Sequence, residues 1–457
     1  MNKKKESQNQ EMLLSSEKPS KAIVKLAVPA TLALLAKAVY NIVDTAYIGM
    51  LGSDIALAAV GVTLPLLLIM VSVENIFAAG AAVLAGRQLG AGDKAEANRT
   101  VSTVVGLSLV IGLCLCVFGI MGMDYLLTAF GASEAVLPQA RDYAFWMFVA
   151  ALANLPAQSL NCAARAESSV KISSIAVVTG AAANVVLDPV FMFDWGLGVA
   201  GASLATTVSQ FITFFIMVWF YWSGRSIIKV KARYFRMGGG LMKTVVLIGI
   251  PTAVIQICLA AATSMTNIAA KSLADGDLII AAYGVVQRLV LIGCYVVLGF
   301  MQGYQPVASY AFGGKLNDRL RESVRFAARA SIVITVVVAA VYILLSRPLI
   351  MLFNQNPTVI DYGAKLLISQ VLLYPAFGLC YMLTITFQTI GASKYGLFLS
   401  VLRQGVLYIP FIMLLPGFMG VAGIYLAQPV ADLQTIAVCC CSIKPMKRIA
   451  LERIQVV

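Results

Sequence analysis

The sequence predicts an all-α membrane protein in which twelve transmembrane helices form two pseudo-symmetric six-helix bundles. Of its 457 residues, 60% are hydrophobic and only 12% are charged, about half the roughly 25% that is typical of soluble domains. Apolar runs such as Ala56–Val73, Thr100–Ile120 and Ala327–Leu345 fit the ~20 residues that cross a ~30 Å hydrocarbon core. The second half of the chain also repeats motifs of the first. These observations indicate a polytopic protein with an internal duplication.

Twelve apolar segments, separated by polar or charged residues, are the predicted spans. They lie near 26–50, 55–84, 101–122, 136–160, 171–193 and 199–222 in the first half, and near 242–270, 278–305, 326–346, 363–386, 395–416 and 419–441 in the second. The first run is too long to be the core of a cleaved signal peptide. The predicted divisions are therefore an N-terminal tail (1–25), an N-lobe (26–224), a linker (225–243), a C-lobe (244–441) and a C-terminal tail (442–457).

Positive charge predicts the orientation of the chain. Lys and Arg are concentrated in both tails, in the linker 225–243 and in alternate connections, whereas the opposite side has only Arg141, Lys271, Arg347 and Lys365. Because cytoplasmic connections carry the excess of Lys and Arg, we expect both termini in the cytoplasm. The net charge of +13 follows this topology rather than forming one face for nucleic acid. We expect a multi-pass protein of the bacterial cytoplasmic (inner) membrane.

Four short motifs recur at an offset of 222 or 223 residues. Val28-Pro29 matches Ile250-Pro251, and the others pair 58–61 with 281–284, 89–91 with 312–314, and 198–201 with 420–423. One match could be coincidence, but four in one register indicate a repeat. Two copies with an even number of spans enter the membrane from the same side, so their symmetry axis runs along the membrane normal, with a cavity between the bundles.

Motifs for enzyme chemistry are absent from the sequence. It has no GxxxxGK[ST] loop, HExxH or GxSxG motif. It has no histidine, and its nine cysteines form no CxxC pair, which argues against zinc sites and a disulfide framework. We expect neither an enzyme nor a cofactor.

Ionisable residues inside the spans are the candidate functional groups, because a charge at mid-helix costs about 2.5–3.5 kcal/mol on insertion scales. In the first span, helical spacing places five polar residues on one stripe that should face the cavity: Lys37, Tyr40, Asn41, Asp44 and Tyr47. In the fifth span, Asn184 and Asp188 share a face, and Pro189 predicts a bend beside Asp188. Such oxygen groups suit Na⁺ or a proton. The alternative interpretation is that Asp44 and Asp188 are hydrogen-bonded residues that only hold helices together.

The repeat makes this prediction asymmetric. Asn41 and Asp44 correspond to Thr263 and Thr266, and Asp188-Pro189 corresponds to Ile409-Pro410. The C-lobe spans instead carry Arg288 and Arg403. We therefore expect intramembrane carboxylates, and the cation site, in the N-lobe only.

Three segments, taken in order, resemble the multidrug and toxic compound extrusion (MATE) family, and most closely its DinF-type bacterial branch. They are Asn41–Gly49 (NIVDTAYIG), Gly86–Asp93 (GRQLGAGD) and Asn184–Pro189 (NVVLDP). Arg403-Gln404-Gly405 and the repeat at Gly198 and Gly420 extend the likeness over nearly the whole chain.

The resemblance implies a V-shaped, two-lobed antiporter that exports amphipathic, often cationic compounds in exchange for H⁺ or Na⁺ by alternating access. It implies a cation site at Asp44, Asn184, Asp188 and Thr206, with Na⁺ possible at the first three, and a bending point at Pro29. We expect the bilayer and small amphipathic substrates as partners, and a monomer.

Lys37 and Glu74 depart from the family pattern, since neutral residues are expected there. Either the two residues pair with each other or Lys37 competes for Asp44. Glu74 and Arg288 thus join Lys37, Tyr40 and Asn41 as polar residues expected in the cavity. The alternative function is a flippase for a lipid-linked precursor, although Asp44 and Asp188 disfavour a pyrophosphate ligand. An ion channel would need one continuous polar pore, which a doubled lobe does not suggest.

Overall fold

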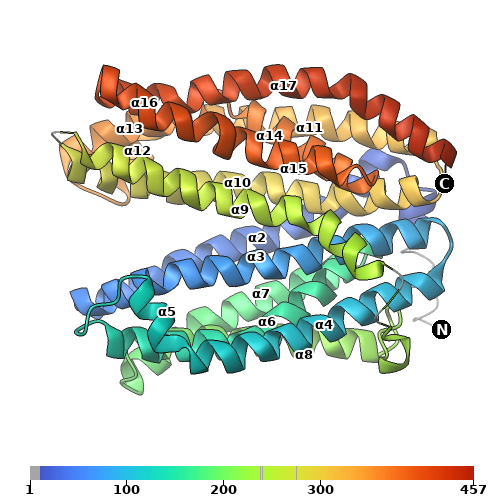
Figure 1. The fold of residues 1–457 in the computed structure, drawn as a ribbon, viewed down its shortest axis with the longest axis horizontal. Coiled ribbons are helices and arrows are strands. Elements are labelled where there is room, and N and C mark those ends of the chain that lie inside the picture. The colour runs from blue at the N-terminus through green and yellow to red at the C-terminus, as the bar shows by residue number, and fades with distance from the viewer. Residues whose placement is uncertain (1–10, 237, 239, 274, 457) are drawn as a thin grey trace.

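Two helical bundles lie one above the other in the computed structural model (Figure 1). The structure describes residues 11–456 except 237, 239 and 274, and for residue 54 and residues 442–456 it describes the backbone only. All secondary structure within this part of the chain is helical. The charges of Lys3–Lys5 and of the C-terminal tail, on which the predicted orientation partly depends, lie outside the described side chains.

The N-lobe contains the lower helices of Figure 1, blue to green. In chain order they are α2 (Pro19–Met50), α3 (Asp54–Gly90), α4 (Lys94–Met121), α5 (Met123–Ala129), α6 (Leu137–Ala166), α7 (Val170–Pro189), the π-helical turn η1 (Val190–Asp194) and α8 (Val199–Trp222). Long apolar runs without internal caps form these helices, and their exposed apolar residues, such as Leu109, Val186 and Phe215, fit a lipid-facing surface.

The linker is held against the N-lobe by polar side chains of α4. Asn98 Oδ1 accepts a hydrogen bond from the Lys229 amide at 2.6 Å, and Ser102 Oγ accepts one from the Lys231 amide at 3.2 Å. The 3₁₀ turn η2 (Ala232–Tyr234) follows. The chain then enters the second bundle at Leu241.

The C-lobe contains the upper helices of Figure 1, yellow to red. They are α9 (Leu241–Lys271), α10 (Gly276–Gly313), α11 (Asn317–Leu344), α12 (Ser346–Met351), α13 (Pro357–Val371), α14 (Pro375–Thr389), α15 (Ser393–Val401), the π-helical η3 (Leu402–Tyr408), α16 (Ile409–Met419) and α17 (Val421–Val456). The helix α2 begins and α17 ends at the same end of the molecule, called here the termini end (right in Figure 1).

Each of the twelve predicted spans coincides with a helix or a short helix series. Ten described segments are long and apolar enough to cross a membrane, and the pair α13–α14, bent by 45°, makes an eleventh. The helix α6 is the twelfth in our count. At 30 residues it is long enough, but Asn154, Gln158 and Asn161 make it less apolar than the others.

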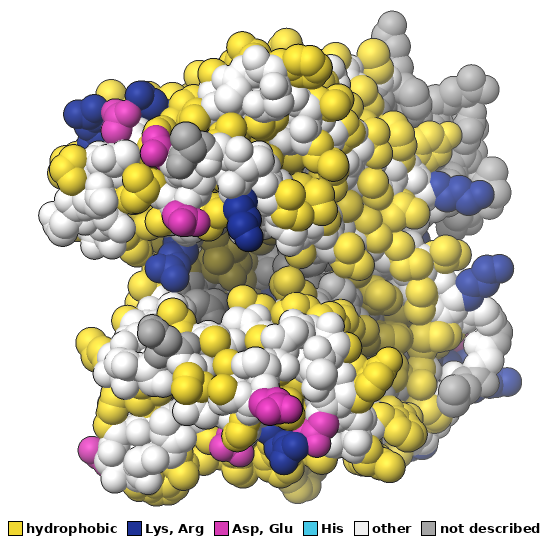
Figure 2. Space-filling model, turned by 60° about the vertical axis from the view of Figure 1, so that its left-hand side comes forward, with side chains coloured by type: hydrophobic (Ala, Val, Ile, Leu, Met, Phe, Trp, Pro, Cys, Tyr) yellow, Lys and Arg dark blue, Asp and Glu magenta, His cyan; other side chains and the backbone are white. Residues whose placement is uncertain are grey.

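The lobes touch at the termini end and separate at the other. A Cβ added to Gly249 of α9 would lie 1.9 Å from the Ile76 carbonyl oxygen of α3, and one added to Gly90 of α3 would lie 2.0 Å from that of Tyr310 in α10. By contrast, added Cβ atoms at Gly61 and Gly284 would have no described atom within 4 Å. Figure 2, which brings the far end forward, shows a hollow between the two halves.

Candidate functional site

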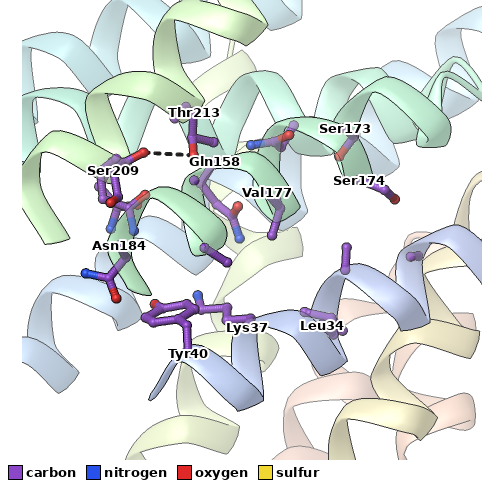
Figure 3. A pocket seen from close by; sticks show the side chains of 18 of the residues that line it. Leu34, Lys37, Tyr40, Gln158, Ser173, Ser174, Val177, Asn184, Ser209 and Thr213 are labelled. Carbon is purple, nitrogen blue, oxygen red and sulfur yellow. Dashed lines mark hydrogen bonds between the residues drawn. The ribbon is translucent and has the colours of Figure 1, made fainter. Parts of the chain in front are cut away.

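A polar cavity of about 70 Å³ lies inside the N-lobe. Its walls come from α2, α3, α6, α7 and α8, and Gln302 of α10 adds a contribution from the C-lobe. Figure 3 shows Lys37 and Tyr40 on α2 facing Asn184 of α7 and Gln158 across this space. A cavity this size holds several waters or an ion, since one water needs about 10–15 Å³.

Three of the four residues that the family resemblance implies are hydrogen-bonded to one another. Asn184 Nδ2 donates to Asp188 Oδ1 and to Thr206 Oγ1, both at 3.2 Å. Asp188 is fully buried, and Asn184 is 1% exposed. The i, i+4 spacing on α7 aligns Asn184 with Asp188, and the neighbouring α8 supplies Thr206.

Oxygen atoms around this cluster are left without donors. Asp188 Oδ2, Asn184 Oδ1 and Asp44 Oδ1 are buried and have no hydrogen-bond partner within the described part of the chain. Buried carboxylate and amide oxygens are costly when unpaired, and Asp44 is close enough for its charge to act on Asp188. The arrangement therefore presents three free acceptors to a cation, a proton or water.

The helix carrying this cluster changes its hydrogen bonding directly after Asp188. The α-helix ends at Pro189, and residues 190–194 continue as a π-helix, closed by a bond from the Trp195 amide to the Val190 carbonyl at 2.9 Å. Proline lacks the amide hydrogen that an α-helix needs, and π-helical turns are frequent at functional sites. Pro29 lies within α2, which continues through it as one helix.

Lys37 and Glu74 line the same cavity but are not an ion pair. Glu74 Oε2 accepts a hydrogen bond from Asn154 Nδ2 at 2.8 Å, and no described acid lies within 4.0 Å of the Lys37 ammonium. Tyr40 also lines the cavity, whereas Asn41 does not. Arg288 is exposed on α10 and lies outside it.

One expectation about the C-lobe is wrong, because it does contain an intramembrane carboxylate. Asp432 of α17 is fully buried, and Arg403 donates to it from Nε at 2.8 Å and from Nη2 at 3.2 Å. Gln428 Nε2 donates to the same carboxylate at 2.8 Å, and the Arg403 guanidinium lies over the Phe377 ring. A buried arginine in a span requires such a partner, which is the signal that could have located Asp432.

The chemistry of the donors suits a monovalent cation better than a transition metal. No group of three or more His, Cys, Asp or Glu side chains that could hold a metal ion occurs among the described residues. The N-lobe cluster instead combines carboxylate, amide and hydroxyl oxygens, which are hard ligands. This set fits Na⁺ or a proton.

The fold and the cavity define a two-lobed helical membrane protein with a polar cavity inside its N-lobe. The chain belongs to the MatE family: the family profile matches twice, over residues 29–190 and 251–414. These matches begin 222 residues apart, which is the offset of the repeated motifs.

The chain is similar to known proteins and solved structures along nearly its whole length. The chain is 24% identical over 415 residues to the multidrug export protein MepA of Staphylococcus haemolyticus, and 23% identical over 412 residues to MepA of Staphylococcus aureus, covering 90% of each chain. A multidrug resistance MATE family transporter, solved in an outward-facing conformation, matches with a TM-score of 0.90 at 23% identity over 96% of this chain and 98% of that one. A MOP superfamily transporter from Pyrococcus furiosus matches with a TM-score of 0.88.

Proposed function

We propose that this protein is a secondary active efflux antiporter that exports amphipathic, often cationic compounds in exchange for H⁺ or Na⁺. The family membership and the likeness to multidrug export proteins support transport rather than enzyme chemistry. We place it as a monomer in the bacterial cytoplasmic membrane with both termini in the cytoplasm. The hollow of Figure 2 then opens outward.

One observation carries the coupling part of this proposal. Asp188 is fully buried in the N-lobe, its neighbour Asn184 supplies a single amide donor, and its Oδ2 lacks a partner among the described residues. Retaining such a group costs stability unless a ligand neutralises it. An ion that binds there and prefers one arrangement of the lobes shifts their equilibrium by its differential affinity.

The site for the exported compound lies elsewhere. Ligand pockets for drug-sized molecules measure about 300–1,000 Å³, whereas the N-lobe cavity measures about 70 Å³. We assign the compound to the hollow between the lobes. The ion and the compound then occupy different sites. Binding of one affects the other by changing the conformation of the lobes, not by competition for the same atoms.

Transport in proteoliposomes tests the proposal. With an imposed H⁺ or Na⁺ gradient, Asp44→Asn and Asp188→Asn abolish gradient-driven export of a fluorescent cationic dye while the protein stays folded. The matched control is Thr263→Ala, at the C-lobe position corresponding to Asn41, where the hydroxyl donates a hydrogen bond to the Leu259 carbonyl of its own helix at 3.0 Å. Full transport by either Asp→Asn variant sinks the proposal, and gradient-independent movement of a lipid-linked pyrophosphate favours the flippase.

Cysteine labelling tests the orientation. Cysteines introduced at Ser53, between α2 and α3, and at Ser226, in the linker, are expected to react from opposite sides of the membrane. Reaction of both from the same side contradicts the topology.

A further inference from the structure

The N-lobe cavity contains a second buried carboxylate. Glu74 lies on α3, is 6% exposed and lines the same cavity as Asn184 and Thr206. Among the described residues, its one hydrogen bond comes from a neutral amide, Asn154 Nδ2, at 2.8 Å. No described Lys or Arg lies within 4.0 Å of it. A membrane-buried carboxylate with only a neutral donor is as costly as Asp188.

Charged and titratable groups surround Glu74 on several helices. The charges of Lys37 on α2 and of Glu74 act on each other, and both act on Tyr40. Further titratable groups nearby are Cys162 of α6, on which the charge of Glu74 acts, Tyr295 of α10, and Asp44, whose charge acts on Tyr40. Lys37 and Arg165 of α6 line the same cavity of about 70 Å³. A metal cation bound at Glu74 would therefore be repelled by two positive charges close by. A proton neutralises the carboxylate without placing another cation there.

Polar atoms connect Glu74 with the Asp188 cluster. Asn161 Oδ1, Ser209 Oγ and Asn184 Oδ1 line the cavity, are at most 4% exposed by residue, and have no hydrogen-bond partner in the described part of the chain. Figure 3 shows Ser209 and Asn184 on the same side of this space as Gln158. Waters that bridge such groups satisfy them and carry protons along the cavity.

We propose that Glu74 is a second coupling carboxylate, which binds one proton per transport cycle in addition to the ion bound at Asp44 and Asp188. This inference rests on the proposed antiport. Glu74 takes the proton from cavity water to give the neutral acid, and returns it to water after the lobes rearrange. Only O–H bonds form and break. The positive charge of Lys37 stabilises the deprotonated carboxylate of Glu74. Because the two side chains form no ion pair, the Glu74 carboxylate stays available to a proton.

The coupling ratio tests this role. In proteoliposomes, the pH gradient that just halts dye flux against a known dye gradient gives the number of protons exchanged per dye. Glu74→Gln is expected to keep gradient-driven transport and to lower this number by one. The matched control is Glu134→Gln, the same change at an exposed acid of the N-lobe, which leaves the number unchanged.

An unchanged ratio in Glu74→Gln overturns the inference. So does loss of all transport in a folded variant, because a second site leaves the first one working. If Glu74→Gln does not fold, Lys37→Met combined with Glu74→Gln removes both charges and gives the same readout. The two proposals fail separately: active transport by Asp188→Asn refutes the antiport site, whereas an unchanged Glu74→Gln ratio beside an inactive Asp188→Asn refutes only the role of Glu74.

Discussion

The two lobes share a scaffold but treat buried polar groups in opposite ways. In the C-lobe, Thr266, which corresponds to Asp44, bonds the Tyr408 hydroxyl at 2.8 Å, and Asp432 is neutralised by Arg403. In the N-lobe, Asp44 and Asp188 keep buried oxygens without partners among the described residues. Both lobes have a π-helical segment beside the matched proline, so the backbone irregularity is common to them. The difference lies in the hydrogen bonding of these particular groups: Thr266, Arg403 and Asp432 have partners in the C-lobe, whereas the N-lobe carboxylates Asp44 and Asp188 keep oxygens that a ligand could bind.

The largest expected effect comes from breaking the C-lobe ion pair. Arg403→Met leaves the Asp432 carboxylate buried and unpaired, which costs about 3–5 kcal/mol. Asp188→Asn is expected to cost little by comparison, since Asp188 has no cationic partner to lose. Thermal unfolding in detergent, followed by tryptophan fluorescence, measures both variants.

A double variant sharpens this comparison. Arg403→Met with Asp432→Asn removes both charges and is expected to recover most of the lost stability. An Arg403→Met protein that melts like the parent shows that the C-lobe pair is not structural. The contrast between the lobes then fails.

Local pattern was sufficient to predict the spans and half of the candidate site. Asn184 and Asp188 are four residues apart on one helix, so their contact follows from helical geometry, and the repeated Pro and Gly motifs set the two lobes in register. Contacts between side chains on different helices were harder to predict from the sequence. Asp432 lies 29 residues from Arg403 and Asn154 lies 80 residues from Glu74. No periodicity encodes such pairs, because they depend on which helices pack together.

Another buried carboxylate tests whether unsatisfied oxygens, rather than burial, mark the coupling site. Glu167, in the connection between α6 and α7, is fully buried but accepts hydrogen bonds from Ser226 Oγ at 2.8 Å, the Ile228 amide at 2.9 Å and Ser169 Oγ at 3.2 Å. It thereby fixes the start of the linker. We expect Glu167→Gln to leave the coupling ratio unchanged.

The effect of Glu167 appears instead in stability as a function of pH. Burial raises the pKa of Glu167 from 4.5 to about 7. The folded protein therefore binds this proton more tightly than the unfolded chain, so the contribution is complete below pH 4.5 and is lost as pH rises through 7. At about 1.4 kcal/mol per pKa unit, this shift of the pKa corresponds to a loss on the order of 3.5 kcal/mol. The melting temperatures of the parent protein and of Glu167→Gln, measured between pH 4.5 and 8, check this prediction. If both melting temperatures change with pH in the same way, the prediction is contradicted.

The smallest expected effect concerns the surfaces where the lobes meet. Gly249→Ala places a methyl group 1.9 Å from the Ile76 carbonyl oxygen, an overpacking that costs about 1–3 kcal/mol and separates the lobes at the termini end. Gly284→Ala, in the same lobe, meets no described atom within 4 Å and improves helix propensity by up to about 1 kcal/mol. Spin labels at Ala91 and Lys315 are therefore expected to move apart in Gly249→Ala and to keep the parental distance in Gly284→Ala. If Gly284→Ala changes that distance as much as Gly249→Ala does, close backbone packing at the termini end is not what holds the lobes in this arrangement.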